Sequence, residues 1–253
     1  MKVISDGMTH IGMVRTRNED HFIVNDELSL YIVADGMGGH VGGEEASRIA
    51  IETVEQVITR LKNNPDDTLP YTYEEKIAPP ARALKYSVRL ASDKIYQKAR
   101  QSPEYRGMGT TVTALWLEGG GAHIAHVGDC RGYLLRDGKI EQLTEDHSWV
   151  QEQVNAGNIS AEEAKNHRLR NVITRSVGFE EDVEIDTYSG DLRAGDIHLL
   201  CSDGLSSLVN EAELNKIARD SEPEEACRQM VDLANERGGT DNITVVIVRV
   251  EEL

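Results

Sequence analysis

Residues 28–61 decide the fold, and they read LSLYIVADGMGGHVGGEEASRIAIETVEQVITRL. The apolar run Leu28–Ala34 predicts a strand of the kind that is buried on both faces. A glycine-rich segment follows Asp35, and beyond Gly43 the apolar residues recur at helical spacing as far as Leu61. The stretch therefore predicts a buried strand, an aspartate at its end and an amphipathic helix.

The same patterns recur along the rest of the chain. Further strands are expected at Thr111–Leu117, Ala122–Val127, Asp196–Cys201 and Ile243–Val250. Residues 132–144, GYLLRDGKIEQLT, predict a hairpin that turns at Asp137-Gly138, because this pair tolerates the positive φ of a tight turn. A second amphipathic helix is expected from Ala81 onward.

Two capping-box patterns predict further helix starts. Ser160 with Glu163 indicates a short helix, and Ser221 with Glu224 indicates a longer one that runs toward Arg237. Helices inserted among antiparallel strands favour an α+β fold over an alternating α/β fold.

The organisation of the chain is simple. Its 253 residues contain no Pro/Gly/Ser-rich linker and no internal repeat, which predicts one domain over residues 1–253. Residues 63–80 are polar and contain proline, so we expect a surface insertion there. Residues from about 146 to 170 are polar and mixed in charge, and we expect them to form a flap.

Charge and composition narrow the class of protein. The 44 acidic and 27 basic residues give a formal net charge of −17, which disfavours nucleic acid and anionic membranes as partners. The acidity fits either a solvated surface or, in part, a carboxylate cluster that binds cations. No apolar stretch approaches the ~20 residues of a membrane span, and no signal peptide is visible. With three cysteines that form no CxxC pair, these features predict a cytoplasmic protein.

Five aspartates stand beside apolar or motif-like segments. Asp20 ends RTRNED, Asp35 ends LYIVAD, Asp129 ends AHIAHVGD, Asp203 ends IHLLCSD, and Asp241 directly precedes NITVVIV. Any one of them could be ordinary turn chemistry, as we expect for Asp137-Gly138. A carboxylate that follows a buried strand is instead partly desolvated, which is costly unless a cation compensates it.

Oxygen ligands without histidine or cysteine suit hard cations such as Mg²⁺ or Mn²⁺. Two such ions that share a bridging aspartate could lower the pKa of a bound water and hold a phosphoryl oxygen. The aspartates therefore predict a cluster for divalent metal ions.

The glycine run DGMGGHVGG, which begins at Asp35, needs a separate interpretation. It lacks the Gly-Lys-Ser/Thr of a P-loop, and the third glycine of a dinucleotide fingerprint would fall on Val41. Two interpretations remain: a flexible turn, or backbone that passes close to a bound ion with the Gly36 carbonyl as a ligand.

Eight separated segments resemble, in order and spacing, the type 2C metal-dependent serine/threonine protein phosphatases (the PPM family), in particular their bacterial branch. They are GMVRTRNED, VADGMGGHVGGE, MGTT, HVGDCRGYL, LTEDHS, HRLRNVITRSVG, LLCSDGL and GGTDNITVV, and they extend from about Gly12 to Val248. The resemblance implies a four-layer αββα sandwich of two central antiparallel sheets flanked by helices. It also implies hydrolysis of phosphoserine and phosphothreonine in proteins by a hydroxide bridging two divalent metal ions.

The resemblance also implies cofactors and partners. The expected cofactors are Mn²⁺ or Mg²⁺, with two core ions and a weaker third. The expected partners are phosphoprotein substrates and a cognate Ser/Thr protein kinase, with no nucleic acid and no membrane. The sequence itself does not determine the oligomeric state, and we expect a monomer.

By resemblance, individual residues of this chain take defined roles. The metal ligands are Asp35, which bridges two ions, the Gly36 carbonyl, Asp20, Asp203, Asp241, and Asp129 for the third ion, while Glu19 binds through water. Arg15 holds the substrate phosphate, with Arg17 as the nearby competitor.

One departure from the family leaves the proton donor open. Many eukaryotic members have a histidine after the Asp-Gly pair, whereas Met37 stands there in this chain. His40, His167 and a metal-bound water remain as candidates. His167 lies in the segment that matches the flap, so it is either a substrate-sensing residue or a solvated surface histidine.

Two other classes of protein compete with this reading. Cys130 and Arg136 have the cysteine-x5-arginine spacing of thiol-based phosphatases, but the intervening RGYLL predicts a strand rather than a phosphate-binding loop. We therefore expect Cys130 to be a small buried residue. A pseudophosphatase on the same fold would have lost metal ligands, whereas the predicted ligand aspartates are all present.

Overall fold

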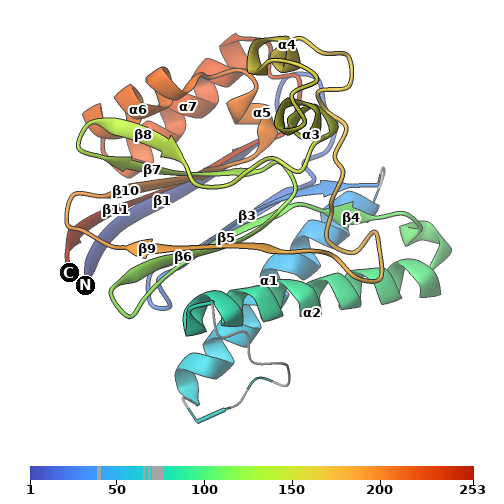
Figure 1. Cartoon of the computed structure of the whole chain (residues 1–253), viewed down its shortest axis with the longest axis horizontal. Helices are drawn as coiled ribbons and strands as arrows, with labels where there is room; N and C mark the ends of the chain where they lie inside the picture. The colour runs from blue at the N-terminus through green and yellow to red at the C-terminus, as the bar shows by residue number, and fades with distance from the viewer. Residues whose placement is uncertain (39–40, 65, 68, 70–76) are drawn as a thin grey trace.

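Four layers, in the order helix–sheet–sheet–helix, make up the protein (Figure 1). The computed structural model describes residues 1–38, 41–64, 66, 67, 69 and 77–253. Both sheets are antiparallel throughout, which confirms the predicted α+β, αββα sandwich. The two termini lie side by side because the first and last strands pair with each other (Figure 1).

The first sheet has five strands. Their order is β1 (Lys2–His10), β11 (Ile243–Glu252), β10 (Ile197–Cys201), β7 (Arg131–Arg136) and β8 (Lys139–Gln142). Asp137 and Gly138 join β7 to β8 with φ values of 53° and 79°. Both angles lie in the left-handed region, so the predicted hairpin turn is confirmed.

The second sheet has six strands. Five follow the order β2 (Asp20–Asn25), β3 (Leu30–Met37), β5 (Val112–Glu118), β6 (Gly121–Val127) and β9 (Asp186–Asp191), and the short β4 (Gly109–Thr110) pairs with the end of β3. Asp35 was expected at the end of its strand, but β3 continues to Met37 because Gly36 and Met37 pair with β4.

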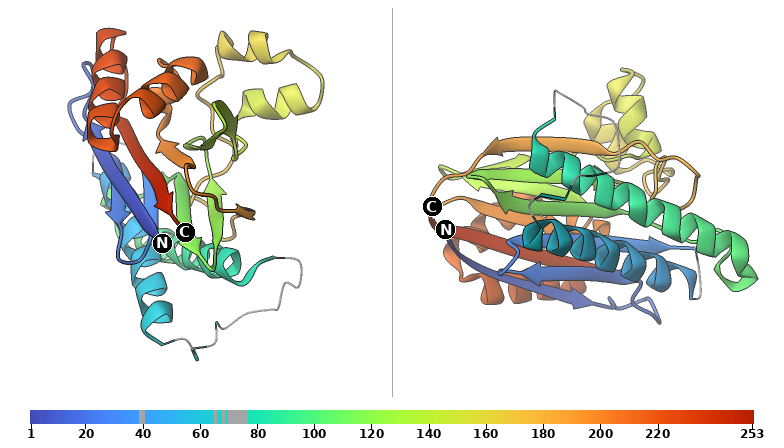
Figure 2. Two further views of the ribbon diagram at one scale, coloured as in Figure 1. Left: turned by 90° about the vertical axis from the view of Figure 1, so that its left-hand side faces the viewer. Right: turned by 90° about the horizontal axis from the view of Figure 1, so that it is seen from below.

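Helices cover the outer faces of both sheets. α1 (Gly42–Asn63) and α2 (Pro79–Gln101) lie side by side on the six-stranded sheet (Figure 2), and a 3-10 turn, η1 (Pro103–Tyr105), follows α2. α5 (Asp203–Ser206), α6 (Glu211–Asp220) and α7 (Pro223–Glu236) cover the five-stranded sheet, and α3 (Trp149–Asn155) and α4 (Ala161–Lys165) lie at one end (Figure 1). None of the helices in the described part of the chain is long and apolar enough to cross a membrane.

Three layers of apolar side chains fill the spaces between these elements, and β3 shows how. Leu30 and Ile32 pack against α1 and α2, whereas Tyr31 and Val33 pack between the two sheets. Successive side chains of a strand point to opposite faces, so a strand that is covered on both faces is apolar at every position. This arrangement explains why residues 30–34 form a continuous apolar run rather than an alternating one.

Some helix starts differ from the prediction. The capping box of Ser160 and Glu163 is present at α4. The one expected at Ser221 and Glu224 is wrong, because Ser221 ends α6 and α7 begins at Pro223 without a side-chain cap. Proline has no N–H to satisfy and its fixed φ suits the first helical position, so this helix start needs no capping side chain.

Two segments were predicted to form a surface insertion and a flap. The predicted insertion, residues 63–80, includes the connection from α1 to α2 (residues 64–78), and positions 65, 68 and 70–76 of it lie outside the described residues. Residues 146–170 contain α3 and α4. Their roles as an insertion and a flap within a single domain remain predictions.

Candidate active site

A cleft of about 490 Å³ lies where strands and loops of the two sheets end together. Most of the predicted site residues line it, namely Arg15, Glu19, Asp35, Gly36, Asp129, Asp203 and Asp241. Its other lining residues are Thr16, Arg17, Met37, Gly38, Asn171, Ile173 and Asn242. The fold thus brings together, in one cleft, acidic residues as distant in the sequence as Glu19 and Asp241.

Asp35 is fixed through its backbone by two threonines. The Asp35 N–H donates to Thr111 Oγ1 at 2.9 Å, and the Asp35 carbonyl accepts from the Thr111 N–H and from Thr110 Oγ1, both at 2.8 Å. The carboxylate is therefore held at a defined position in the cleft wall. The sequence analysis named Thr111 only as the first residue of an expected strand and did not predict this role for either threonine.

Two glycines allow backbone segments to approach each other beside the cleft. A Cβ atom at Gly36 would lie 2.1 Å from the Gly43 carbonyl oxygen, and one at Gly204 would lie 1.9 Å from the Asn242 carbonyl oxygen. No side chain fits at such distances, so α1 can pack on β3, and α5 beside β11, only because these residues are glycine. The glycine run after Asp35 thus has a packing function as well as a place in the cleft.

Asp20 lies beside the cleft rather than in its wall. It is only 3% exposed, and its Oδ2 accepts hydrogen bonds from Ser202 Oγ at 2.8 Å and Thr244 Oγ1 at 2.6 Å. Its Oδ1 has no hydrogen-bond partner among the described residues. Ser202 and Thr244 were not predicted as partners of Asp20, although Ser202 directly precedes Asp203 and Thr244 follows Asp241 by three residues.

Asp241 and its neighbour Asn242 connect the N-terminal loop to the cleft. Arg15 Nη2 donates to Asp241 Oδ2 at 2.6 Å. The Asn242 side chain donates to the carbonyls of Ile11 and Arg17, each at 2.9 Å, and accepts from the Glu19 N–H at 2.8 Å. The loop that carries Arg15 is therefore tied to the start of β11.

Asp203 and Asp129 each have an unsatisfied oxygen. Asp203 begins α5 two residues after the end of β10, and Asp129 lies between β6 and β7, where it is 6% exposed. The Oδ1 atoms of both residues are buried and have no hydrogen-bond partner in the described part of the chain. The loop of Asp129 is held by His147, whose N–H donates to the Gly128 carbonyl at 2.7 Å and whose Nδ1 accepts from the Gly128 N–H at 3.1 Å.

The carboxylates of the site disturb one another's ionisation. Burial, reinforced by the charges of the neighbouring aspartates, raises the pKa of Asp35 and of Asp129 well above the ordinary value. Burial also raises the pKa of Asp20 to about 7 and that of Asp203 to about 6. Each group is thus costly to ionise in this protein, which is the condition that a bound cation would relieve.

The donor set fits divalent metal ions. Carboxylate oxygens without hydrogen-bond partners on Asp20, Asp129 and Asp203 are the hard ligands that Mg²⁺ and Mn²⁺ prefer. No three acidic, histidine or cysteine side chains of the described residues already stand in the arrangement of a metal site. Carboxylates repel one another at short range, so carboxylates that line the same cleft do not close around a common point in the absence of a cation.

Of the two predicted histidines, His167 is not among the residues that line the cleft. His40 lies outside the described residues. His167 is half-buried, stacks on Trp149 with ring centroids 4.9 Å apart, and accepts the Leu169 N–H through Nδ1 at 3.2 Å. Its described contacts are therefore within the α3–α4 segment, from which Asn171 and Ile173, a few residues further on, reach the cleft.

The thiol-phosphatase alternative is excluded by the geometry. Cys130 is completely buried, its Sγ lies 2.9 Å from Thr111 Oγ1, and burial raises the pKa of the thiol well above its ordinary value. Arg136 ends strand β7 and donates to Asp196 Oδ1 and Oδ2 at 2.7 and 2.6 Å. The segment is a strand, as expected, and forms no phosphate-binding loop.

The two antiparallel sheets and the carboxylate cleft are the fold and the site of a metal-dependent hydrolase, as comparison with known proteins shows. The family model of protein phosphatase 2C matches residues 7–240. The serine/threonine phosphatase stp of Listeria innocua is 38% identical over 244 residues, which cover 95% of this chain and 93% of that protein. The chain belongs to the protein phosphatase 2C family, a family of metal-dependent serine/threonine protein phosphatases.

Solved structures agree with this assignment. The crystal structure of the serine/threonine phosphatase PstP/Ppp of Mycobacterium tuberculosis matches with a TM-score of 0.87 and 35% identity over 99% of both chains. A crystal structure of the PstP catalytic domain in complex with two manganese ions matches with a TM-score of 0.83 and 34% identity, again over 99% of both chains. The resemblance inferred from eight sequence motifs is thereby confirmed at the level of family and fold.

Proposed function

We propose that this protein hydrolyses phosphoserine and phosphothreonine in proteins and so reverses the action of a Ser/Thr protein kinase. The observation that carries the proposal is that Asp129 and Asp203 line one cleft with Arg15, and that each has a buried carboxylate oxygen without a hydrogen-bond partner among the described residues. Two Mn²⁺ or Mg²⁺ ions in such a cleft would supply an activated water and a clamp for phosphoryl oxygens.

The residues of the site would have separate roles in binding the metal ions and the substrate phosphate. The two core ions would be held by Asp35, Asp203, Asp241, the Gly36 carbonyl and the neighbouring Asp20, with Glu19 acting through water. Asp129 together with Asp203 would hold a weaker third ion. Arg15 lies at the rim of the cleft with its guanidinium on Asp241, and from there it can bind the phosphate of a substrate by charge-assisted hydrogen bonds.

The proton donor for the leaving alcohol remains to be assigned among His40, His167 and a water. The contacts of His167 with Trp149 and Leu169 favour a structural role for that residue. A monomeric, cytoplasmic protein with a cognate kinase is part of the same proposal.

The test is hydrolysis of a phosphothreonine peptide by the purified protein, with and without added Mn²⁺. We expect activity that depends on the metal and is lost in Asp241→Ala. Activity that survives thorough chelation, or that is unaffected by Asp241→Ala, would contradict the proposal. A protein that binds the phosphopeptide without hydrolysing it would instead be a pseudophosphatase.

A further inference from the structure

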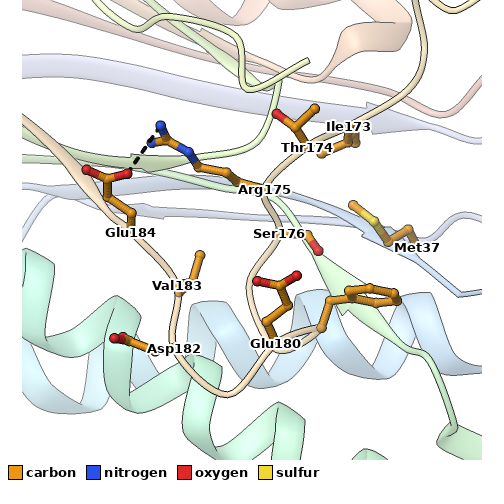
Figure 3. Close-up of a pocket in the computed structure, with 10 residues that line it drawn as sticks. Met37, Ile173, Thr174, Arg175, Ser176, Glu180, Asp182, Val183 and Glu184 are labelled. Carbon is orange, nitrogen blue, oxygen red and sulfur yellow. Dashed lines mark ion pairs between the residues drawn. The ribbon is translucent and has the colours of Figure 1, made fainter. Parts of the chain in front are cut away.

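A second pocket adjoins the candidate active site. It has a volume of about 380 Å³ and shares Met37 and Ile173 with the catalytic cleft. Its other lining residues belong to the segment that leads from the flap to β9, namely Thr174, Arg175, Ser176, Phe179, Glu180, Asp182, Val183 and Glu184 (Figure 3). A peptide whose phosphoresidue lies in the cleft can therefore place a neighbouring side chain in this pocket.

The loop that forms the pocket is anchored to the rest of the fold. Val177 pairs with Thr110 through two backbone hydrogen bonds of 2.8 and 3.0 Å, and the Gly178 N–H donates to Ser92 Oγ of α2 at 3.0 Å. Val177 and Val183 are both buried. The pocket wall is thus held in place before any ligand binds, which lowers the entropic cost of binding.

The charge of the pocket is negative. Glu180, Asp182 and Glu184 line it together with a single cation, Arg175, which already pairs with Glu184 at 3.3 Å and with Asp186 at 3.2 Å. Glu180 makes no hydrogen bond or ion pair with the residues that the structure describes. Figure 3 shows its carboxylate directed into the space enclosed by the loop, toward Ser176, whereas Asp182 points away from it.

The pocket also offers apolar surface for the stem of a long side chain. Phe179 is 59% exposed although it is aromatic, and Met37 contributes its thioether at the border with the cleft. Lysine and arginine bury an aliphatic stem and keep the charged group in contact with water or a carboxylate. An aromatic ring beside the stem can add a cation–π contribution.

We propose that this pocket selects substrates by binding an arginine or lysine side chain close to the phosphoresidue, with Glu180 as the ion-pair partner and Phe179 as the apolar support. The inference rests on the proposed phosphatase function and adds the substrate class. The net charge of −17 favours the approach of the same basic peptides.

The experiment compares phosphothreonine peptides that differ only in one flanking arginine, which is replaced by glutamine. The arginine is placed in turn at each of about three positions on either side, the reach of an extended chain at roughly 3.3 Å per residue. At one or more positions, the wild-type protein should show a kcat/KM about three- to tenfold higher for the arginine peptide. In Glu180→Gln this ratio should fall toward one, and Phe179→Ala should lower it in part.

Glu181→Gln is the matched control, because it removes the same charge from the adjacent exposed residue, which does not line the pocket. It should keep the wild-type ratio. A wild-type ratio of one at every position, or equal losses in Glu180→Gln and Glu181→Gln, would overturn the pocket proposal while hydrolysis itself stands. Failure of the wild-type protein to hydrolyse both the peptides and p-nitrophenyl phosphate with Mn²⁺ would overturn the proposed function and the pocket together.

Discussion

The two ends of strand β10 carry aspartates in opposite electrostatic conditions. Asp196, directly before the strand, is 1% exposed and accepts two hydrogen bonds from Arg136, at 2.7 and 2.6 Å, and one from the Arg193 N–H at 2.8 Å. Asp203, two residues after the strand, has a buried oxygen with no partner among the described residues. At one end of the strand the aspartate is paired with an arginine, whereas at the other end Asp203 forms no ion pair with a described residue.

The ionisation of the two carboxylates follows this difference. Burial raises the pKa of Asp196, but the hydrogen bonds from Arg136 and Arg193 outweigh it, so the pKa is lowered overall. Burial and the charge of Asp241 raise the pKa of Asp203 to about 6. Burial is common to both ends, so what distinguishes Asp203 from Asp196 is that no described arginine or lysine donates hydrogen bonds to it.

The largest effect is expected from Asp35→Asn, which removes a carboxylate from the cleft that Asp35 and Asp203 line together. The loss of a bridging ligand should lower Mn²⁺-dependent kcat by about 10³-fold or more, a loss of several kcal/mol in transition-state stabilisation. Steady-state kinetics on a phosphothreonine peptide measures it. Asp137→Asn is the control, because that aspartate lies in an ordinary hairpin turn whose positive φ asparagine tolerates, and its activity should stay at the wild-type level.

Asp196→Asn removes the carboxylate that pairs with Arg136 at the other end of β10, and it should lower stability rather than activity. The change leaves Arg136 without its counter-charge, so the free energy of unfolding should fall by about 2–4 kcal/mol. Urea denaturation at pH 7 measures this loss. A change below about 0.5 kcal/mol, the size of an ordinary surface substitution, would show that the Arg136 pair does not stabilise the fold.

Asp203→Asn should have a smaller effect of the opposite sign, and this effect should depend on pH. With chelator present and above pH 6, Asp203 is ionised in the folded and unfolded states, so its removal relieves repulsion and should add about 1 kcal/mol, or roughly 2–4 °C in Tm. Between pH 6 and 4 the folded wild-type protein takes up the proton before the unfolded chain does, so the gain should disappear toward pH 4.

Thermal unfolding of both proteins from pH 4 to 8 checks this prediction. The buried residues His126 and His198, whose pKa values burial lowers to about 4, titrate over the same range, but they are present in both proteins and cancel in the difference. A gain that is constant with pH would contradict the assignment of a raised pKa to Asp203.

Cys130→Ser should have the smallest effect. The thiol is completely buried, lies 2.9 Å from Thr111 Oγ1 and does not line the cleft, so activity should change by no more than about twofold and Mn²⁺ dependence should be retained. Complete loss of activity in a folded Cys130→Ser protein would revive the thiol mechanism that the geometry excludes.

The sequence predicted the central strands well and the edge strands poorly. β3, β5, β6, β10 and β11 are covered on both faces, so their apolar runs are continuous. β1, β2 and β9 lie at sheet edges, are only partly buried and carry polar residues, and the sequence analysis missed all three. Edge strands commonly carry such residues, so their periodicity is weak.

The sequence predicted the aspartates of the site but not the side chains that position them. The aspartates stood out because each adjoins an apolar run or a repeated Asp-Gly or Asp-Asn pair. The side chains that hold them, such as Thr111, Asn242 and His147, are distant in sequence or uncharged, and only the fold brings them into contact. Hydrogen bonds between distant residues leave no periodic signal in a single sequence.

Calorimetric titration of Mn²⁺ into the chelator-treated protein at pH 6 tests the central claim most directly, when it is run in two buffers of different ionisation heat. We predict that at least two ions bind and that protons are released, because Asp20 and Asp203, with pKa values of about 7 and 6, are partly protonated at this pH and must ionise to bind a metal. Asp35→Asn should abolish most of the binding. Absence of binding at millimolar Mn²⁺, or binding without proton release that is unchanged in Asp35→Asn, would contradict the account.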